Sequence, residues 1–234
     1  MDNNKNKKLE IYRINNAFSY IKKKEFKKAE DIFRDLIKKK TKNFDVYVNF
    51  ARILGLQNKK KEMVEAYKEA IKLNHNFPEA YSNIGNTYFE KKEFKKAISY
   101  YDQAVKLNPY HAESFYNYGN ALIEVEDFKK AILCYEKTIK INPNFYLAHN
   151  NLANIYANQG NLIKSIEYFK RTLIINNKHH SARHNLGMIQ LLCNDYKEGL
   201  VNFEFRHNKL KGNTLHAKPK IKRWYGEEIK IGEK

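Results

Sequence analysis

The sequence has 234 residues, of which 42% are hydrophobic and 14% aromatic, a composition that favours a folded protein with a substantial core. It has no long apolar run, and Met1 leads into the polar segment DNNKNKKLE, which argues against a transmembrane helix and an export signal. Cys134 and Cys193 lie far apart and outside any metal-binding spacing, which argues against a disulfide framework or zinc site. We therefore expect a soluble, cytoplasmic protein.

The formal charge of +18 is concentrated at the two ends of the chain. Residues 1–43 carry 14 basic and 6 acidic groups, and residues 206–234 carry 9 and 3. The middle is close to neutral, which does not favour a basic groove along the whole molecule. The basic ends have two interpretations: a compositional bias of the source genome, or a weak attraction to acidic partners, anionic lipids or nucleic acid.

After a basic segment at residues 1–9, which we expect to form a tail, the sequence repeats with a period of 34 residues. The blocks begin at Glu10, Phe44, Pro78, Ala112, Tyr146 and His180. We call each position within a block a column. Column 8 is always small, column 20 is small in five blocks and column 24 is always aromatic. Their residues are Ala17, Ala51, Gly85, Gly119, Ala153 and Gly187; Ala29, Met63, Ala97, Ala131, Ser165 and Gly199; and Phe33, Tyr67, Tyr101, Tyr135, Phe169 and Phe203.

Each block predicts a hairpin of two amphipathic helices. Columns 4, 7, 8 and 11 are apolar or small, as in Tyr81, Ile84, Gly85 and Tyr88, and this spacing forms one stripe on a helix. A second stripe follows a polar turn such as NQGN at 158–161. The small columns indicate that the two helices pack closely.

These columns resemble the tetratricopeptide repeat (TPR) over residues 10–213, in six repeats of which the first, second and sixth are less regular. The resemblance implies an all-α, right-handed superhelical solenoid of about six antiparallel helix pairs. The first helix of each pair would line a concave groove.

Column 6 is asparagine in all six blocks, and column 9 is asparagine in the three central ones. Asparagine makes up about one residue in eight, too few for chance to explain such a column. At about 100° per residue, both columns lie opposite the apolar stripe, so we expect them to face the groove. The candidate binding residues are Asn15, Asn49, Asn83, Asn86, Asn117, Asn120, Asn151, Asn154 and Asn185.

An asparagine amide can bond both the N–H and the C=O of a peptide, so a row of them would hold an extended polypeptide whatever its sequence. The row is similar to the asparagine ladder in the TPR superhelix of O-linked N-acetylglucosamine transferases, on motifs such as NNLAN at 150–154. The alternative is structural: each asparagine bonds its neighbour along the solenoid and ties the repeats together. The two interpretations are compatible.

Two other uses of related folds are not favoured. Carboxylate-clamp TPR domains carry Lys and Arg in columns 2, 5 and 6, whereas column 2 here includes Asp45, Glu79 and Glu113, and column 6 has no basic residue. Pentatricopeptide RNA binders have a period nearer 35 and more basic grooves, which does not favour a nucleic-acid partner.

Residues 214–234 depart from the repeat and are expected to form a basic tail or a junction. Trp224 could fold back and cap the solenoid. FEFR at 203–206 and WYGEE at 224–228 also look like the junction between TPRs and a glycosyltransferase-like domain in bacterial proteins. That resemblance makes the chain the truncated or separately encoded substrate-recruiting arm of a glycosyltransferase.

The sequence offers no catalytic constellation, cofactor motif or small-molecule site. His180 and His184 have a spacing that could share a metal, but no further ligand supports them, and we expect them to face solvent. We conclude that the chain is a non-enzymatic scaffold for a protein or extended peptide. The alternatives are the glycosyltransferase arm and a basic surface module for nucleic acid or membranes. Neither the partner's identity nor the oligomeric state follows from the sequence.

Overall fold

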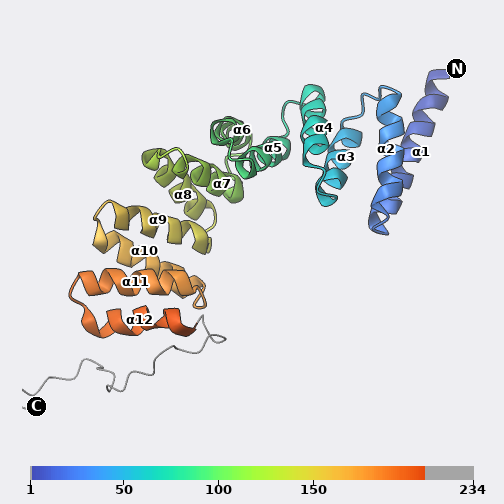
Figure 1. The fold of residues 1–234 in the computed structure, drawn as a ribbon. Helices are drawn as coiled ribbons and strands as arrows, with labels where there is room; N and C mark the ends of the chain where they lie inside the picture. The colour runs from blue at the N-terminus through green and yellow to red at the C-terminus, as the bar shows by residue number, and fades with distance from the viewer. Residues whose placement is uncertain (1, 209–234) are drawn as a thin grey trace, which may run out of the picture. The chain divides into compact units, whose positions relative to one another are not determined.

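The computed structural model describes residues 2–208, in which every regular element is an α-helix, as expected for an all-α repeat fold (Figure 1). The chain divides into two compact units, Met1–Glu126 and Asp127–Lys234. Unit 1 contains α1 (Asp2–Lys22), α2 (Phe26–Lys38), α3 (Phe44–Leu56), α4 (Lys60–Leu73), α5 (Pro78–Glu90), α6 (Phe94–Leu107) and α7 (Ala112–Ile123). Unit 2 contains α8 (Phe128–Ile141), α9 (Tyr146–Asn158), α10 (Leu162–Ile175), α11 (His180–Leu192) and α12 (Tyr196–Asn208).

The first helix of a block begins at the expected residue in five of the six blocks: α3, α5, α7, α9 and α11 begin at residues 44, 78, 112, 146 and 180. The first block differs, because α1 begins at Asp2 and residues 2–9 are helical rather than a separate tail. No proline or glycine stands in this segment to end the helix before residue 10. The expected tail or junction at 214–234, including Trp224 and WYGEE, lies outside the described residues.

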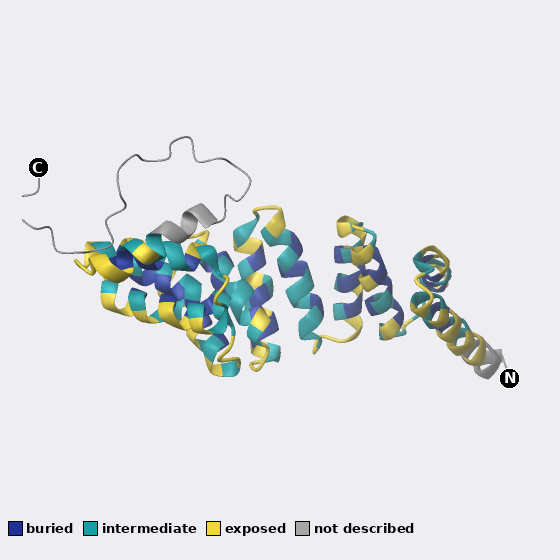
Figure 2. Ribbon diagram, turned by 90° about the horizontal axis from the view of Figure 1, so that it is seen from below, coloured by how far each residue is buried: buried dark blue, intermediate teal, exposed yellow. Residues whose placement is uncertain are grey.

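Consecutive helices pack against each other within each unit, for example α3 with α4 and α9 with α10. Figure 2 shows the buried residues as stripes along the helices and the exposed residues at many of the turns. The small residues of columns 8 and 20 lie in these stripes: Ala17, Ala29, Ala97 and Ala153 have no exposed surface. Close packing between paired helices explains why these columns are small.

Gly85 shows how tight the contact is. A Cβ atom on Gly85 would lie 2.8 Å from Cε1 of Tyr101, a ring that is 1% exposed in the paired helix α6. In the second hairpin, column 20 holds the larger Met63, and Gly55 of α3 faces it, with 3.0 Å between the position of a Cβ and the Met63 sulfur. A glycine one turn further along α3 thus makes room where the column itself is not small.

Every turn between the two helices of a block contains one residue with a left-handed backbone. Its φ lies between 57° and 74°, and it is always in column 15. Only one of the six is glycine, although glycine adopts this conformation at least cost. The residues are Lys24, Asn58, Lys92, Glu126, Gly160 and Asn194.

A buried ion cluster links the first two hairpins. Glu30 of α2 has no exposed surface and accepts hydrogen bonds from Nζ of Lys59 at 2.8 Å and from Arg34 at 2.9 Å. Burial by itself would raise the pKa of Glu30, but hydrogen bonds from Lys59, Arg34 and Gln57 outweigh it and lower the pKa to about 2. Because Lys59 directly precedes α4, this cluster fixes α4 to α2.

Candidate functional site

Two asparagines of column 6 bond to the column 24 tyrosine of the preceding repeat. The Nδ2 atom of Asn83 in α5 donates to the hydroxyl of Tyr67 in α4 at 3.1 Å. In unit 2, Nδ2 of Asn151 in α9 donates to the hydroxyl of Tyr135 in α8 at 3.2 Å. Both pairs are 16 residues apart and join one repeat to the next. The structure therefore contains the bonds between repeats that the structural interpretation requires.

Two further asparagines of column 6 bond to the column 9 asparagine of the preceding repeat. Nδ2 of Asn117 donates to Oδ1 of Asn86 at 3.2 Å, and Nδ2 of Asn185 donates to Oδ1 of Asn154 at 3.1 Å. The same Asn86 oxygen accepts a hydrogen bond from the hydroxyl of Tyr101 at 2.6 Å. Asn86 departs from the expected orientation, because it contacts α6, the helix paired with its own.

The first two asparagines of the column behave differently. Nδ2 of Asn49 donates to the Asp45 carbonyl of its own helix at 2.8 Å, and Asn15 is exposed. The residue 16 positions before Asn49 is Phe33, which has no hydroxyl to bond it. The distinction between tyrosine and phenylalanine in column 24 was the sequence signal that predicts which asparagines bond to the preceding repeat's ring.

The tyrosines that hold these amides stay protonated. Burial raises the pKa of Tyr67 to about 12, and burial also raises the pKa of Tyr101. Both rings are at most 2% exposed. The hydroxyl groups therefore remain neutral hydrogen-bonding groups throughout the physiological pH range.

A polar cleft of about 510 Å³, which we call the asparagine cleft, opens in unit 1. It is lined by Phe77, Pro78, Glu79, Ser82, Asn83, Asn86, Asn108, His111, Glu113, Ser114 and Asn117. A smaller cleft of about 250 Å³ shares Asn86 and Asn117 and adds Asn120 and Glu90. Four of the nine candidate asparagines thus line two clefts that share residues of α5 and α7.

The bonds to tyrosine and asparagine use only part of each amide. Within residues 2–208, Oδ1 of Asn83, Nδ2 of Asn86 and Oδ1 of Asn117 have no hydrogen-bond partner. None of the three is among the buried polar atoms that lack a partner. The asparagine cleft therefore offers two acceptors and one donor, held by amides whose other ends are fixed.

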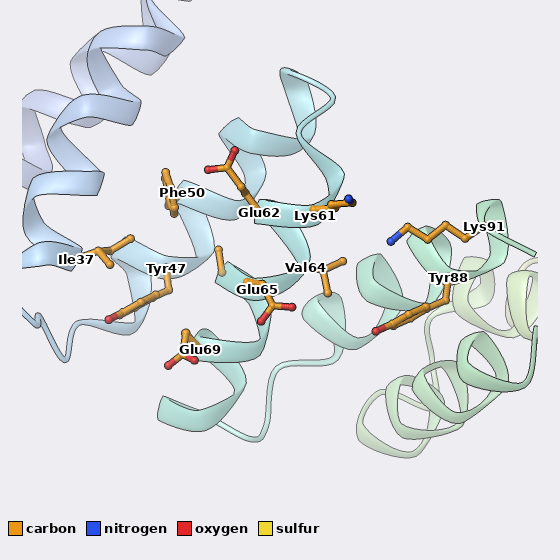
Figure 3. A pocket seen from close by; sticks show the side chains of 11 residues that line it. Ile37, Tyr47, Phe50, Lys61, Glu62, Val64, Glu65, Glu69, Tyr88 and Lys91 are labelled. Carbon is orange, nitrogen blue, oxygen red and sulfur yellow. The ribbon is translucent and has the colours of Figure 1, made fainter. Parts of the chain in front are cut away.

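Figure 3 shows a second cleft in unit 1, which we call the apolar cleft. Its volume is about 600 Å³, and its apolar lining comes from Ile37, Tyr47, Phe50, Val64, Ala66 and Tyr88. Lys61, Glu62, Glu65, Glu69 and Lys91 complete the lining. Glu62, Glu65 and Glu69 each form an ion pair, with Arg34, Lys68 and Lys72.

No group of three potential metal ligands is present among the described residues. His184 does not face solvent as expected, because its ring packs on Phe203 of α12 with 4.9 Å between the ring centroids. No helix within residues 2–208 has both the length and the apolar character needed to cross a membrane.

Family models of the tetratricopeptide repeat match residues 78–111, 100–132 and 146–179, and a further TPR model matches 51–91 and 119–160. The matches run without a gap from residue 51 to residue 179, more than half of the chain. The chain belongs to the tetratricopeptide repeat family. All the matched models describe the repeat and none a glycosyltransferase, so they give the resemblance to glycosyltransferase arms no support.

Solved TPR structures have the same fold. MamA is 25% identical over 69% of this chain and 95% of its own, with a TM-score of 0.65. YrrB, described as a TPR protein with an unusual peptide-binding site, is 22% identical over 77% of this chain and 93% of its own, with a TM-score of 0.67. A TPR protein of Cytophaga hutchinsonii is 14% identical over 87% of this chain and 84% of its own, with a TM-score of 0.72. The search of curated proteins found no match.

Proposed function

We propose that this TPR chain is a scaffold for protein interactions that binds an extended polypeptide through its asparagines. The observation that carries the proposal is the asparagine cleft, in which three amide atoms remain unbonded beside amide atoms that are fixed. The same role is proposed for the remaining candidates, Asn15, Asn49, Asn120, Asn151, Asn154 and Asn185.

The chemistry matches a peptide backbone. The open oxygens of Asn83 and Asn117 can accept from peptide N–H groups, and the open Nδ2 of Asn86 can donate to a peptide C=O. No side chain of the peptide is needed for these bonds, so binding would depend little on its sequence. YrrB supports the proposal only as a TPR protein that also has a peptide-binding site.

The structural bonds and the proposed binding support each other. A side chain that is already held by a buried tyrosine loses little rotamer freedom when a ligand binds, which lowers the entropic cost of association. The bonds from Tyr67 to Asn83 and from Tyr101 to Asn86 would therefore preorganise the amides for the peptide.

The test uses a fluorescent pool of capped peptides of random sequence, about ten residues long, or about 33 Å when extended. Replacing Asn83, Asn86 and Asn117 together with alanine should weaken binding by about tenfold or more, because each lost hydrogen bond contributes about 0.5–1.5 kcal/mol. Anisotropy titrations measure the affinity, and urea unfolding of the same samples measures the stability.

The matched control is Tyr67→Phe together with Tyr101→Phe, which removes the same structural bonds but leaves the amides in the cleft. The proposal requires that the tyrosine variant keep most of its affinity although its stability falls. Equal loss of binding in both variants at equal folded fraction would show that the asparagines act only between repeats.

A further inference from the structure

The two clefts of unit 1 carry negative charge in a strongly basic chain. Glu79 and Glu113 line the asparagine cleft and Glu90 lines the smaller one, and neither cleft has a lysine or arginine among its described lining residues. The chain as a whole has a formal charge of +18. The local charge of these clefts is therefore opposite to that of the protein.

The three carboxylates are not equally available. Arg52 of α3 neutralises Glu79 through two hydrogen bonds, from Nε at 2.9 Å and from Nη2 at 2.6 Å. Glu90 is paired with Lys60. Glu113 is exposed and has no ion pair or hydrogen bond within residues 2–208. Glu113 is thus the carboxylate of the asparagine cleft that can receive a cation from a ligand.

Helix stability alone does not account for these carboxylates. Glu79 and Glu113 stand in the first turns of α5 and α7, where a negative charge interacts favourably with the helix dipole. However, the equivalent residues of α9 and α11 are Leu147 and Ser181, and both helices form without an acidic residue in the first turn. The charge distinguishes the clefts of unit 1 from the corresponding columns of unit 2.

The carboxylates do not define the site by themselves; the cleft and its open amide atoms do. We propose that the asparagine cleft selects extended peptides that carry lysine or arginine side chains, with the backbone held by the amides and a basic side chain paired with Glu113. This inference rests on the proposed function and adds the chemical class of the partner.

The experiment compares three capped peptides of about ten residues, long enough at about 3.3 Å per residue to cross the cleft. One alternates serine and lysine, one serine and glutamine, and one serine and glutamate. Affinities for the full chain are measured by anisotropy at low and at high salt. The matched variants are Glu113→Gln in the asparagine cleft and Glu65→Gln, an exposed residue of α4 that lines the apolar cleft.

The lysine peptide should bind about two- to fivefold more tightly than the glutamine peptide at low salt, the range of a single exposed ion pair, and the difference should shrink at high salt. Glu113→Gln should abolish this preference without changing the affinity for the glutamine peptide. Glu65→Gln should preserve it.

Equal affinity of the wild-type chain for the lysine and glutamine peptides would overturn the selectivity while leaving the proposed function intact. An equal loss in both variants would also overturn it, because the attraction would then come from the overall charge. If none of the three peptides binds, the proposed function fails and the selectivity with it.

Discussion

The hydroxyl of Tyr67 accepts a hydrogen bond from Asn83, a residue 16 positions later on the first helix of the next repeat. The two side chains belong to the two most regular columns of the sequence, the aromatic column 24 and the asparagine column 6. A contact between them makes the asparagine column partly a device for joining repeats, whatever it binds.

Removing this bond should lower stability from either side. Tyr67→Phe and Asn83→Ala should each reduce the free energy of unfolding by about 1 kcal/mol, because each leaves a partly buried polar group without its partner. In the double variant the two losses should not add, and the coupling should be about 1 kcal/mol. Urea unfolding of the four proteins measures it. Fully additive losses would show that the bond contributes nothing to stability.

The reverse change tests the rule that relates tyrosine to the next asparagine. Phe169 stands 16 residues before Asn185 and is fully buried, and Asn185 now bonds Asn154 instead. Phe169→Tyr should change stability by less than about 0.5 kcal/mol in the wild-type chain, where Asn185 can bond the new hydroxyl. In an Asn185→Ala background the hydroxyl is left unpaired, and the same change should cost about 1–3 kcal/mol. Equal costs in the two backgrounds, measured by urea unfolding, would contradict the rule.

The repeat was predictable because its period is set by packing. A small residue in column 8 is required wherever a paired helix comes close, as Gly85 shows against Tyr101, and this requirement recurs every 34 residues. The start of the first helix was not predictable in the same way. Residues 2–9 have no preceding repeat to set their register, and helix α1 simply continues through them.

The site was less predictable than the fold. The position of a column around the helix gives the direction of its side chains but not their partners. Asn49, Asn83 and Asn117 occupy one column, yet they bond a backbone carbonyl, a tyrosine and another asparagine. The partner depends on residues in neighbouring repeats, such as Phe33 in place of a tyrosine, and only three-dimensional contacts reveal it.

The left-handed turn residues predict a stabilising substitution. Lys92 has a φ of 60°, a conformation that costs a residue with a Cβ about 1 kcal/mol or more. Lys92→Gly should therefore raise the free energy of unfolding by up to about 1 kcal/mol. Its neighbour Lys91 has a φ of −80° and provides the control, since Lys91→Gly gains nothing and should destabilise the chain. The rule would be wrong if the two glycine variants changed stability alike in urea unfolding.

The Glu30 cluster predicts a pH dependence of stability. The pKa of Glu30 falls from its ordinary value of 4.5 to about 2 in the folded chain, so the folded state binds this proton more weakly than the unfolded state does. The resulting stabilisation is complete above about pH 4.5 and is lost as the pH falls toward 2. A shift of this size corresponds to about 3 kcal/mol.

Urea unfolding across this pH range measures the effect against Glu30→Gln, which keeps the shape of the side chain but cannot titrate. The difference in stability between the wild-type chain and Glu30→Gln should shrink by about 3 kcal/mol between pH 4.5 and pH 2, because every other carboxylate is common to both proteins. Lys59→Met should reduce this pH-dependent change, since it removes the strongest of the hydrogen bonds that lower the pKa of Glu30. A difference that stays constant with pH would mean that Glu30 titrates near its ordinary value, and the cluster would then not hold α4 to α2 through its charge.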